Sequence, residues 1–113
     1  MADRTLFEKI IAREIPADLL HEDEHCVAFA DINPQAPVHL LIVPRKPIPT
    51  LNDLAPDDAP VVGHLFTVAR DLMAARGEKD FRTVFNCGEG AGQTVWHLHL
   101  HVLAGRTLGW PPG

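Results

Sequence analysis

The segment 96–102 places a histidine at every second position and a hydrophobic residue between each pair of them. Side chains on a β-strand alternate between its two faces. The pattern therefore predicts a strand over Thr94–Leu103 whose hydrophobic side faces a core. His97, His99 and His101 would then share the opposite side, with neighbouring residues about 7 Å apart at the backbone.

Three explanations compete for this row of imidazoles. The first is a half-exposed strand whose polar side happens to be rich in histidine, which suits one such residue better than three. The second is a zinc site, since histidines two positions apart on a strand suit zinc and a third protein ligand would complete a catalytic site. The third is phosphoryl or nucleotidyl transfer, in which a neutral imidazole is the nucleophile and its neighbours donate protons or bind phosphate.

The glycine-rich loop before the histidines favours the third explanation. Glycines in 88–92 would let backbone N–H groups approach an anion, although glycines more often simply make a turn. Gln93 and Thr94 would add side-chain donors next to the histidines, and Asn86 lies at the other end of the loop. Loop and histidines together predict a phosphate pocket.

A helix is predicted near the N-terminus. Thr5 and Glu8 fit a capping box, in which each side chain satisfies the other residue's backbone N–H. Pro16 disfavours helix at the preceding residue, so the helix should end near Ile15. Its hydrophobic face would consist of Leu6, Ile10 and Ile11. The charged residues of this segment are untypical of a signal peptide, so we expect a cytoplasmic protein.

Further patterns predict strands and one long helix joined by short connections. They are a hairpin over Leu19–Glu22 and Cys26–Ala30, a buried strand over Val38–Val43, a helix over Asp57–Arg76 and a strand over Phe81–Asn86. Asp57 or Asp58 would cap the long helix. Two helices and about five strands predict one α+β domain over residues 1–113, with an antiparallel sheet.

Charge and cysteine content exclude several classes of protein. The formal net charge is −5, from 10 basic and 15 acidic residues, which argues against a nucleic acid polymer or an anionic membrane as partner. The two cysteines, Cys26 and Cys87, are far apart and cannot form a disulfide framework. The longest apolar run, Leu40–Val43, is far too short to cross a membrane.

The segment His97–Leu103 has the form His-φ-His-φ-His-φ-φ, where φ is hydrophobic. With it, the sequence resembles the Hint branch of the histidine-triad (HIT) superfamily. The resemblance covers nearly the whole chain, including Phe29–Pro37, His39, Gly92–Thr94 and Trp110–Gly113. It implies a HIT-like fold and a homodimer in which one sheet continues across the interface. It also implies that the tail, residues 104–113 with Trp110, reaches the partner's active site.

The resemblance implies hydrolysis of purine nucleoside 5′-phosphoramidates, such as AMP-lysine or AMP-amide, by cleavage of the P–N bond. His99 would be the nucleophile and would form a covalent nucleotidyl-imidazole. His101 would contact the α-phosphate, and His97 would orient the nucleophile by fixing its tautomer. His39 would join Thr94 and His101 in delivering a proton to the leaving amine.

The resemblance further implies a site for an AMP- or GMP-type nucleotide, with no cofactor or metal. Asp31 would accept the ribose hydroxyls, although it could simply cap the Asn33-Pro34 turn. His39 could likewise be a satisfied core histidine. Phe29 and Ile32 would line the purine pocket. Residues at phosphate and leaving-group positions would be Asn86, Gly92, Gln93, Thr94, His99 and His101.

Two alternatives remain open. One is a Fhit-like hydrolase of dinucleoside polyphosphates, against which the ending Trp110–Gly113 argues. The other is a nucleotide-binding or protein-interaction module with little turnover, against which the intact triad, Thr94 and His39 argue. The sequence departs from the family pattern at Cys87, Ala104 and Gly109, and has Thr94 where serine is common. The changes in the tail bear on the choice of leaving group.

Overall fold

The computed structural model describes residues 4–113 and is built around one five-stranded antiparallel sheet with strand order β1-β2-β3-β5-β4. The strands are β1 (Leu19–Glu22), β2 (Cys26–Ala30), β3 (Val38–Pro44), β4 (Phe81–Val84) and β5 (Leu100–Ala104). The α-helices are α1 (Leu6–Ile11) and α2 (Ala59–Ala75). Short 3-10 turns lie at η1 (Leu51–Asp53), η2 (Pro56–Asp58) and η3 (Glu89–Ala91). The predicted α+β fold is confirmed.

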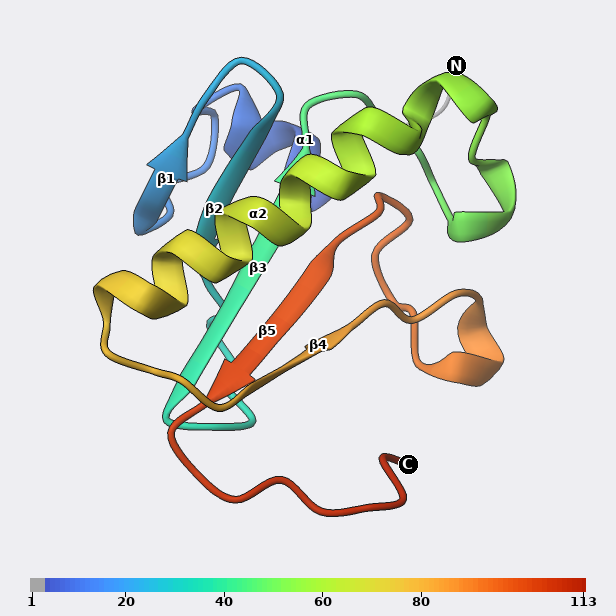
Figure 1. Cartoon of the computed structure of the whole chain (residues 1–113). Helices are drawn as coiled ribbons and strands as arrows, with labels where there is room; N and C mark the ends of the chain where they lie inside the picture. The colour runs from blue at the N-terminus through green and yellow to red at the C-terminus, as the bar shows by residue number, and fades with distance from the viewer. Residues whose placement is uncertain (1–3) are drawn as a thin grey trace.

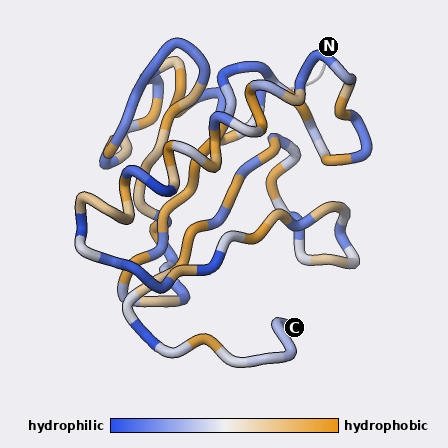
Figure 2. Tube along the Cα trace, in the orientation of Figure 1, coloured by the Kyte–Doolittle hydropathy of each residue, from blue (hydrophilic) through white to orange (hydrophobic). Residues whose placement is uncertain are grey.

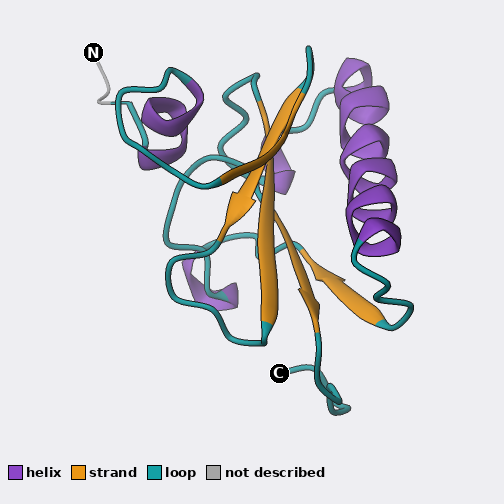
Figure 3. Cartoon of the chain, turned by 90° about the vertical axis from the view of Figure 1, so that its left-hand side faces the viewer, coloured by secondary structure: helices purple, strands orange, loops and turns teal. Residues whose placement is uncertain are grey.

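The two helices lie on opposite faces of the sheet (Figures 1 and 3). Successive residues of β2 and β3 alternate between two hydrophobic clusters, so these central strands bury both of their faces. Apolar residues accordingly follow the strands in the middle of the molecule, whereas the β1–β2 turn is hydrophilic (Figure 2). Neither helix in the described chain has the length and apolarity that a bilayer crossing needs.

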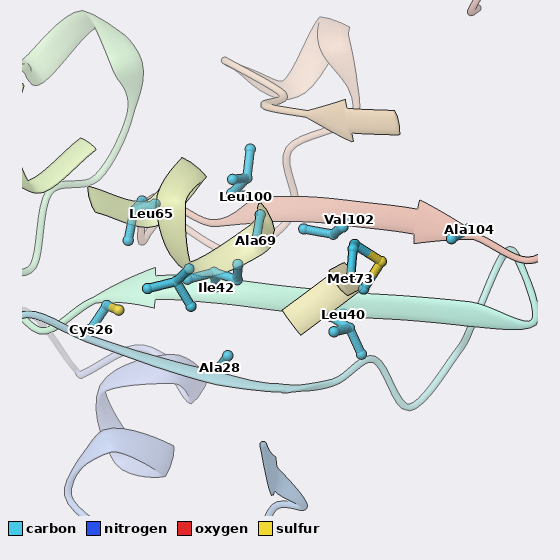
Figure 4. Packing of buried hydrophobic residues seen from close by; sticks show 11 residues of the cluster. Cys26, Ala28, Leu40, Ile42, Leu65, Ala69, Met73, Leu100, Val102 and Ala104 are labelled. Atoms are coloured by element: carbon cyan, nitrogen blue, oxygen red, sulfur yellow. The ribbon is translucent and has the colours of Figure 1, made fainter. Parts of the chain in front are cut away.

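The α2 face carries the larger core (Figure 4). Hydrophobic residues of α2 at helical spacing pack on the sheet, and Leu65 and Met73 are fully buried. Gly77, with φ +73°, ends the helix in the left-handed conformation, and the Glu78 N–H bonds back to the Met73 carbonyl. The buried residues of this cluster are Cys26, Ala28, Leu40, Ile42, Leu65, Val68, Ala69, Met73, Leu100, Val102 and Ala104.

The α1 face carries a smaller cluster, because α1 has only six residues. The capping box is present: Thr5 Oγ1 accepts from the Glu8 N–H at 3.2 Å, and Glu8 Oε1 accepts from the Thr5 N–H at 3.0 Å. The predicted end at Ile15 was wrong. The helix stops at Ile11 because the chain turns back at Arg13, whose φ is +62°.

The predicted hydrophobic side of α1 was also partly wrong. Phe7 and Ile10 are the buried residues of α1, whereas Leu6 is 43% exposed. Neither Asp57 nor Asp58 caps α2 with its side chain. The Asp58 carboxylate instead accepts from Lys46 Nζ at 2.6 Å and from the Ala55 N–H at 2.9 Å, which forms the turn η2 before the helix.

The strand predicted over Thr94–Leu103 is regular only from Leu100. The β3–β5 register pairs Ile42 with Leu100, so the next partner positions on β3 approach Pro44, which has no N–H to continue the ladder. Before Leu100 the chain bonds elsewhere: the Leu98 N–H donates to the Ile48 carbonyl at 2.7 Å. Likewise, β4 ends at Val84 rather than at Asn86.

Candidate active site

A pocket of about 470 Å³ opens on the α1 face of the sheet. Phe7 and Phe29 line it and pack edge to face, with ring centroids 5.5 Å apart. Polar side chains from three separate segments line it as well: Asp31, Thr94, His99 and His101. A pocket that joins an apolar wall to a few convergent polar groups is typical of a small-molecule site. A larger and more open hollow, about 900 Å³, lies at 77–82 and 105–108 and has no histidine in its lining.

The ring of His99 is held in a single tautomer. Its Nδ1 lies 2.7 Å from the His97 carbonyl oxygen, which can only accept, so Nδ1 carries the hydrogen. The other nitrogen, Nε2, therefore holds the lone pair. Phe7 packs edge to face on the ring, with centroids 4.8 Å apart, and fixes its plane. His99 is thus a neutral, oriented imidazole on the pocket wall.

A chain of hydrogen bonds gives His101 the opposite arrangement. The backbone N–H of Gln35 donates to His39 Nδ1 at 2.9 Å, so the hydrogen of the neutral His39 ring is on Nε2. His39 Nε2 lies 2.9 Å from His101 Nδ1 and donates to it. The hydrogen of His101 is consequently on its Nε2. Within residues 4–113 that buried atom has no hydrogen-bond partner, so the pocket contains a donor that lacks an acceptor.

Burial keeps all four rings neutral. Desolvation lowers the pKa of His97, His99 and His39 below the usual histidine value, and the nearby Asp31 carboxylate only partly opposes this for His99 and His39. Desolvation and the neighbouring His99 and His39 lower the pKa of His101 to about 4. The tautomers assigned from the hydrogen bonds therefore describe the protein at neutral pH.

His97 does not orient His99 through its ring. The His97 Nε2–H donates to the Pro44 carbonyl at 2.7 Å, and the ring is fully buried under Phe7. The group that fixes the His99 tautomer is the backbone carbonyl of His97. The His97 ring anchors the irregular segment before β5 to the end of β3.

Asp31 caps a turn and also lines the pocket. Its Oδ1 accepts from the Asn33 N–H at 2.9 Å, which caps the turn. Its Oδ2 lies 3.4 Å from His39 Nε2, and the side chain lines the pocket. His39 is in turn a buried histidine with a partner at each ring nitrogen. The two interpretations of each residue are compatible.

The glycine-rich loop is a closed turn rather than an open anion cradle. The N–H groups of Ala91 and Gly92 donate to carbonyls within the loop, and the Gly88 N–H donates to Gln93 Oε1 at 2.9 Å. Gly88 and Gly92 have φ of +91° and +96°, so glycine is needed there for the turn itself. The simpler explanation of the glycines is the one that the structure favours.

The expectation that the Gln93 side chain offers donors to phosphate is contradicted. Its Nε2 donates to the carbonyls of Pro49 at 2.7 Å and Val95 at 3.0 Å, and the residue is 2% exposed. Both amide hydrogens are therefore already used. Gln93 connects the loop to the segment after β3, so its role is to hold the loop in place.

The pocket brings together six of the predicted nucleotide-binding residues. These are Phe29, Asp31, Ile32, Thr94, His99 and His101. Ile32 stands at the rim, 96% exposed. The pocket lining does not include Asn86, Gly92 or Gln93. Trp110 is 82% exposed on the C-terminal tail and also lies outside the lining.

Sequence reasoning missed the α1 wall of the pocket. Phe7 touches the rings of His97, His99 and Phe29, and Ile10 and Leu41 complete the apolar lining. The available signal was the capping box, which sets where α1 begins and so which side chains face the sheet. Periodicity over six residues is too short to choose between Leu6 and Phe7.

Comparison with family models and with related proteins gives consistent results. Residues 4–109 match the family model described as scavenger mRNA decapping enzyme C-term binding. A HIT-like protein of Synechocystis sp. is 54% identical, and a HIT-like protein of Synechococcus elongatus is 48% identical, each over the full length of both chains.

Solved structures agree with this result. A HIT family hydrolase from Legionella pneumophila superposes with a TM-score of 0.94 and 48% identity, covering 97% of this chain and all of the other. A histidine triad protein from Clostridium difficile superposes with a TM-score of 0.91 and 38% identity, covering 96% and 97% of the two chains.

Proposed function

Because this chain belongs to the histidine-triad (HIT) family, we propose that it is a hydrolase of purine nucleoside 5′-phosphoramidates that cleaves the P–N bond. One observation carries the proposal: adjacent rings in one pocket hold opposite tautomers. His99 offers a lone pair at Nε2, and His101 offers an N–H at Nε2. A nucleophile beside a hydrogen-bond donor is what attack on a phosphoryl group requires.

In the first step, His99 Nε2 attacks the α-phosphorus. A bond forms between Nε2 and phosphorus, and the bond from phosphorus to the amine nitrogen breaks. The amine leaves with one added proton. In the second step, water attacks the same phosphorus, and the bond from phosphorus to Nε2 breaks with its electron pair returning to Nε2. The water gives one proton to the His39–His101 pair, and the nucleoside monophosphate leaves. The division replaces one difficult displacement with two easier ones.

His101 binds the α-phosphate through its Nε2–H, which satisfies that donor. The negative charge of the phosphate raises the pKa of the hydrogen-bonded His39–His101 pair and opposes the desolvation that keeps it neutral in the free protein. The pair then takes up one proton from solvent and gives it to the leaving amine, with the Thr94 hydroxyl on the same pocket wall as an intermediary.

The nucleoside occupies the apolar part of the pocket. Phe29 and the α1 wall contact the purine, and Ile32 covers it from the rim. Asp31 retains acceptor capacity on Oδ2, because within residues 4–113 only the 3.4 Å contact to His39 occupies it. The ribose hydroxyls donate there, which favours ribonucleotides over deoxynucleotides.

The same proposal includes a cytoplasmic homodimer. β4 is an edge strand, and Phe81 on it is 39% exposed, while Phe66 on α2 is 41% exposed. An open edge beside exposed aromatic residues suits pairing with a second copy. The exposed Trp110 would then contribute to the partner's site.

The test is release of AMP from adenosine 5′-phosphoramidate by wild type and His99→Ala, each with and without chelator. We expect chelator-resistant turnover that falls by at least about 10⁴-fold in the variant. Acid quenching should trap a nucleotidyl adduct on wild type only. Diadenosine polyphosphate is measured in parallel: if it is the better substrate, the Fhit-like activity replaces this one. Binding of AMP without turnover would leave a binding module.

A further inference from the structure

A second cluster of ligand-type side chains lies on the α2 face, away from the pocket. It joins His21 of β1, Asp23 of the β1–β2 turn, Cys26 of β2 and His64 of α2, and we call it the hairpin cluster. One ligand atom from each residue lies within 4.8 Å of the ligand atoms of the others. The donors are two imidazole nitrogens, one carboxylate oxygen and one sulfur.

The turn itself orients Asp23. Its Oδ1 accepts from the backbone N–H groups of His25 at 2.7 Å and Cys26 at 2.9 Å. This leaves Oδ2 facing the other members of the cluster. His21 Nε2 lies 2.6 Å from it, His64 Nε2 lies 2.7 Å from it, and Cys26 Sγ lies 3.5 Å from it. Three donors from separate elements thus converge on a single oxygen.

This donor set matches one class of cation. Imidazole, thiolate and carboxylate in fourfold coordination suit Zn²⁺ and related first-row ions, whereas Ca²⁺ and Mg²⁺ require oxygen donors. A carboxylate and a thiolate together carry two negative charges, which neutralise a dication. Tetrahedral ligands on zinc lie about 3.3 Å apart, given bonds of about 2.0 Å, so the two imidazoles need to move outward by less than about 1 Å.

The surroundings allow the ion to enter. The side chains of His21 and His64 are each 34% exposed and that of Asp23 is 25% exposed, while Cys26 is fully buried beneath them. Burial raises the pKa of the Cys26 thiol to about 12, so the free protein holds the sulfur protonated. A coordinated cation displaces that proton to solvent. Arg45 stays clear of the donor atoms by bonding the Asp23 carbonyl and Glu22.

We propose that the hairpin cluster binds a divalent transition-metal ion of the Zn²⁺ type and thereby ties the β1–β2 hairpin to α2. The site is structural, since all four ligands come from the protein and none lines the pocket. It is independent of the hydrolase proposal, because the pocket lies on the opposite face of the sheet.

The test is titration of chelator-treated full-length protein with Co²⁺ and Zn²⁺. We expect one ion per chain and, with Co²⁺, a near-ultraviolet thiolate-to-metal band. Cys26→Ser should abolish the band, and Cys87→Ser should retain it. His64→Gln and His21→Gln remove half-exposed ligands without opening the core, and each should weaken Zn²⁺ binding by at least about tenfold.

His25→Gln is the matched control, because His25 packs its ring on His64 at 5.4 Å but is not a member of the cluster. It should bind Zn²⁺ with wild-type affinity. In wild type, free Zn²⁺ at 100 times the dissociation constant should raise the folding equilibrium constant about 100-fold, and His64→Gln should lose this gain.

Two outcomes overturn the proposal. One is the absence of a thiolate band together with equal Zn²⁺ affinity in wild type, His21→Gln and His64→Gln. The other is binding that disappears in His39→Gln instead, which would place the ion at Asp31, His39 and His101, the second group with ligand spacing. Turnover of the phosphoramidate reports on neither outcome, so the two proposals fail separately.

Discussion

The two faces of the sheet are built from the same strands but differ in role: one is a hydrophobic core, and the other holds the pocket. On the α2 face, a helix of 17 residues lies over the sheet and the strand side chains beneath it are apolar. On the α1 face, a helix of six residues covers only part of the sheet. The uncovered part holds the pocket, and the histidines of the row line or support it.

The difference shows how one strand can serve stability and chemistry together. Leu100 and Val102 of β5 are buried in the α2-face core, while His99 and His101 line the pocket. Because the alternation places them on different sides, neither set constrains the other. The larger hydrophobic cluster lies on one face, and the two buried polar side-chain atoms that lack a partner within residues 4–113, His97 Nδ1 and His101 Nε2, belong to the other.

The largest effect on activity is expected from removing the hydrogen-bond donor of the pocket, His101. His101→Ala should lower kcat/KM for the phosphoramidate by about 10²–10⁴-fold. The change removes the donor to the phosphate and the ring through which His39 is connected to the pocket. The free energy of unfolding in urea should fall by about 1–3 kcal/mol, since the change also removes the ring nitrogen that accepts the His39 Nε2–H. Activity within tenfold of wild type would contradict this role.

A substitution on the α2 face should have the reverse effect, with a large loss of stability and little loss of activity. Leu65→Ala should lower the free energy of unfolding by about 2–5 kcal/mol, because Leu65 is fully buried between α2 and the sheet. The kcat/KM of the folded protein should stay within about threefold of wild type. Urea denaturation and activity of the same sample measure both. Leu6→Ala, at a residue 43% exposed, is the control for stability. A matching loss of activity would show that the faces are coupled.

Acid pH distinguishes the faces without a mutation. Burial lowers the pKa of His99 below the usual histidine value and brings that of His101 to about 4, so both rings take up protons at lower pH than an ordinary imidazole does. At pH 5.5 an ordinary imidazole is about nine-tenths protonated, which would cost about tenfold in nucleophile. We expect kcat/KM to fall by less than about tenfold between pH 7 and pH 5.5, and a tenfold loss would mean that His99 titrates as an ordinary histidine.

The same shift predicts the sign of the stability change. A histidine with a depressed pKa binds its proton in the unfolded chain first, so the unfolded state holds more protons between about pH 6.5 and the folded pKa. Stability should be full above pH 6.5 and should fall toward pH 4. Urea midpoints across this range test it: a flat profile would mean that the rings titrate normally.

The smallest effect is expected at the cap of α1. Thr5→Ala removes one half of the capping box and should lower the free energy of unfolding by about 1 kcal/mol. Because α1 forms a wall of the pocket, KM for the nucleotide should rise more than kcat falls. Thr67→Ala, an exposed position on α2, should leave KM unchanged. An equal KM in both variants would show that α1 does not contribute to nucleotide binding.

Local patterns predicted the elements that depend on neighbouring residues. The hairpin, the Val38–Val43 strand and the Thr5–Glu8 capping box are confirmed almost residue for residue. Each depends on alternation, turn chemistry or a cap within a few positions. The alternation of 96–102 also predicted which side chains reach the core, although only its second half forms ladder bonds.

Contacts between distant residues could not be predicted in this way. The Gln93 amide donates to the Pro49 carbonyl, 44 positions away. The Asp58 carboxylate accepts from Lys46 instead of capping the helix that it precedes. The hairpin cluster needs His64 to meet Asp23 across 41 positions. The opposite tautomers of His99 and His101 depend on backbone groups that no side-chain pattern reveals.

The backbone amide of Gln35 limits the direction from which a proton can reach His101. An amide N–H donates a hydrogen bond but does not release its proton in this pH range, so the Gln35–His39–His101 chain is closed at its inner end. A proton that leaves His101 cannot be replaced from the Gln35 end, so its replacement comes from the pocket or through the Asp31 carboxylate, whose Oδ2 lies 3.4 Å from His39 Nε2. Because Asp31 also lines the pocket, the group that holds the ribose in the proposed complex is at the same time a route for the proton of the next turnover.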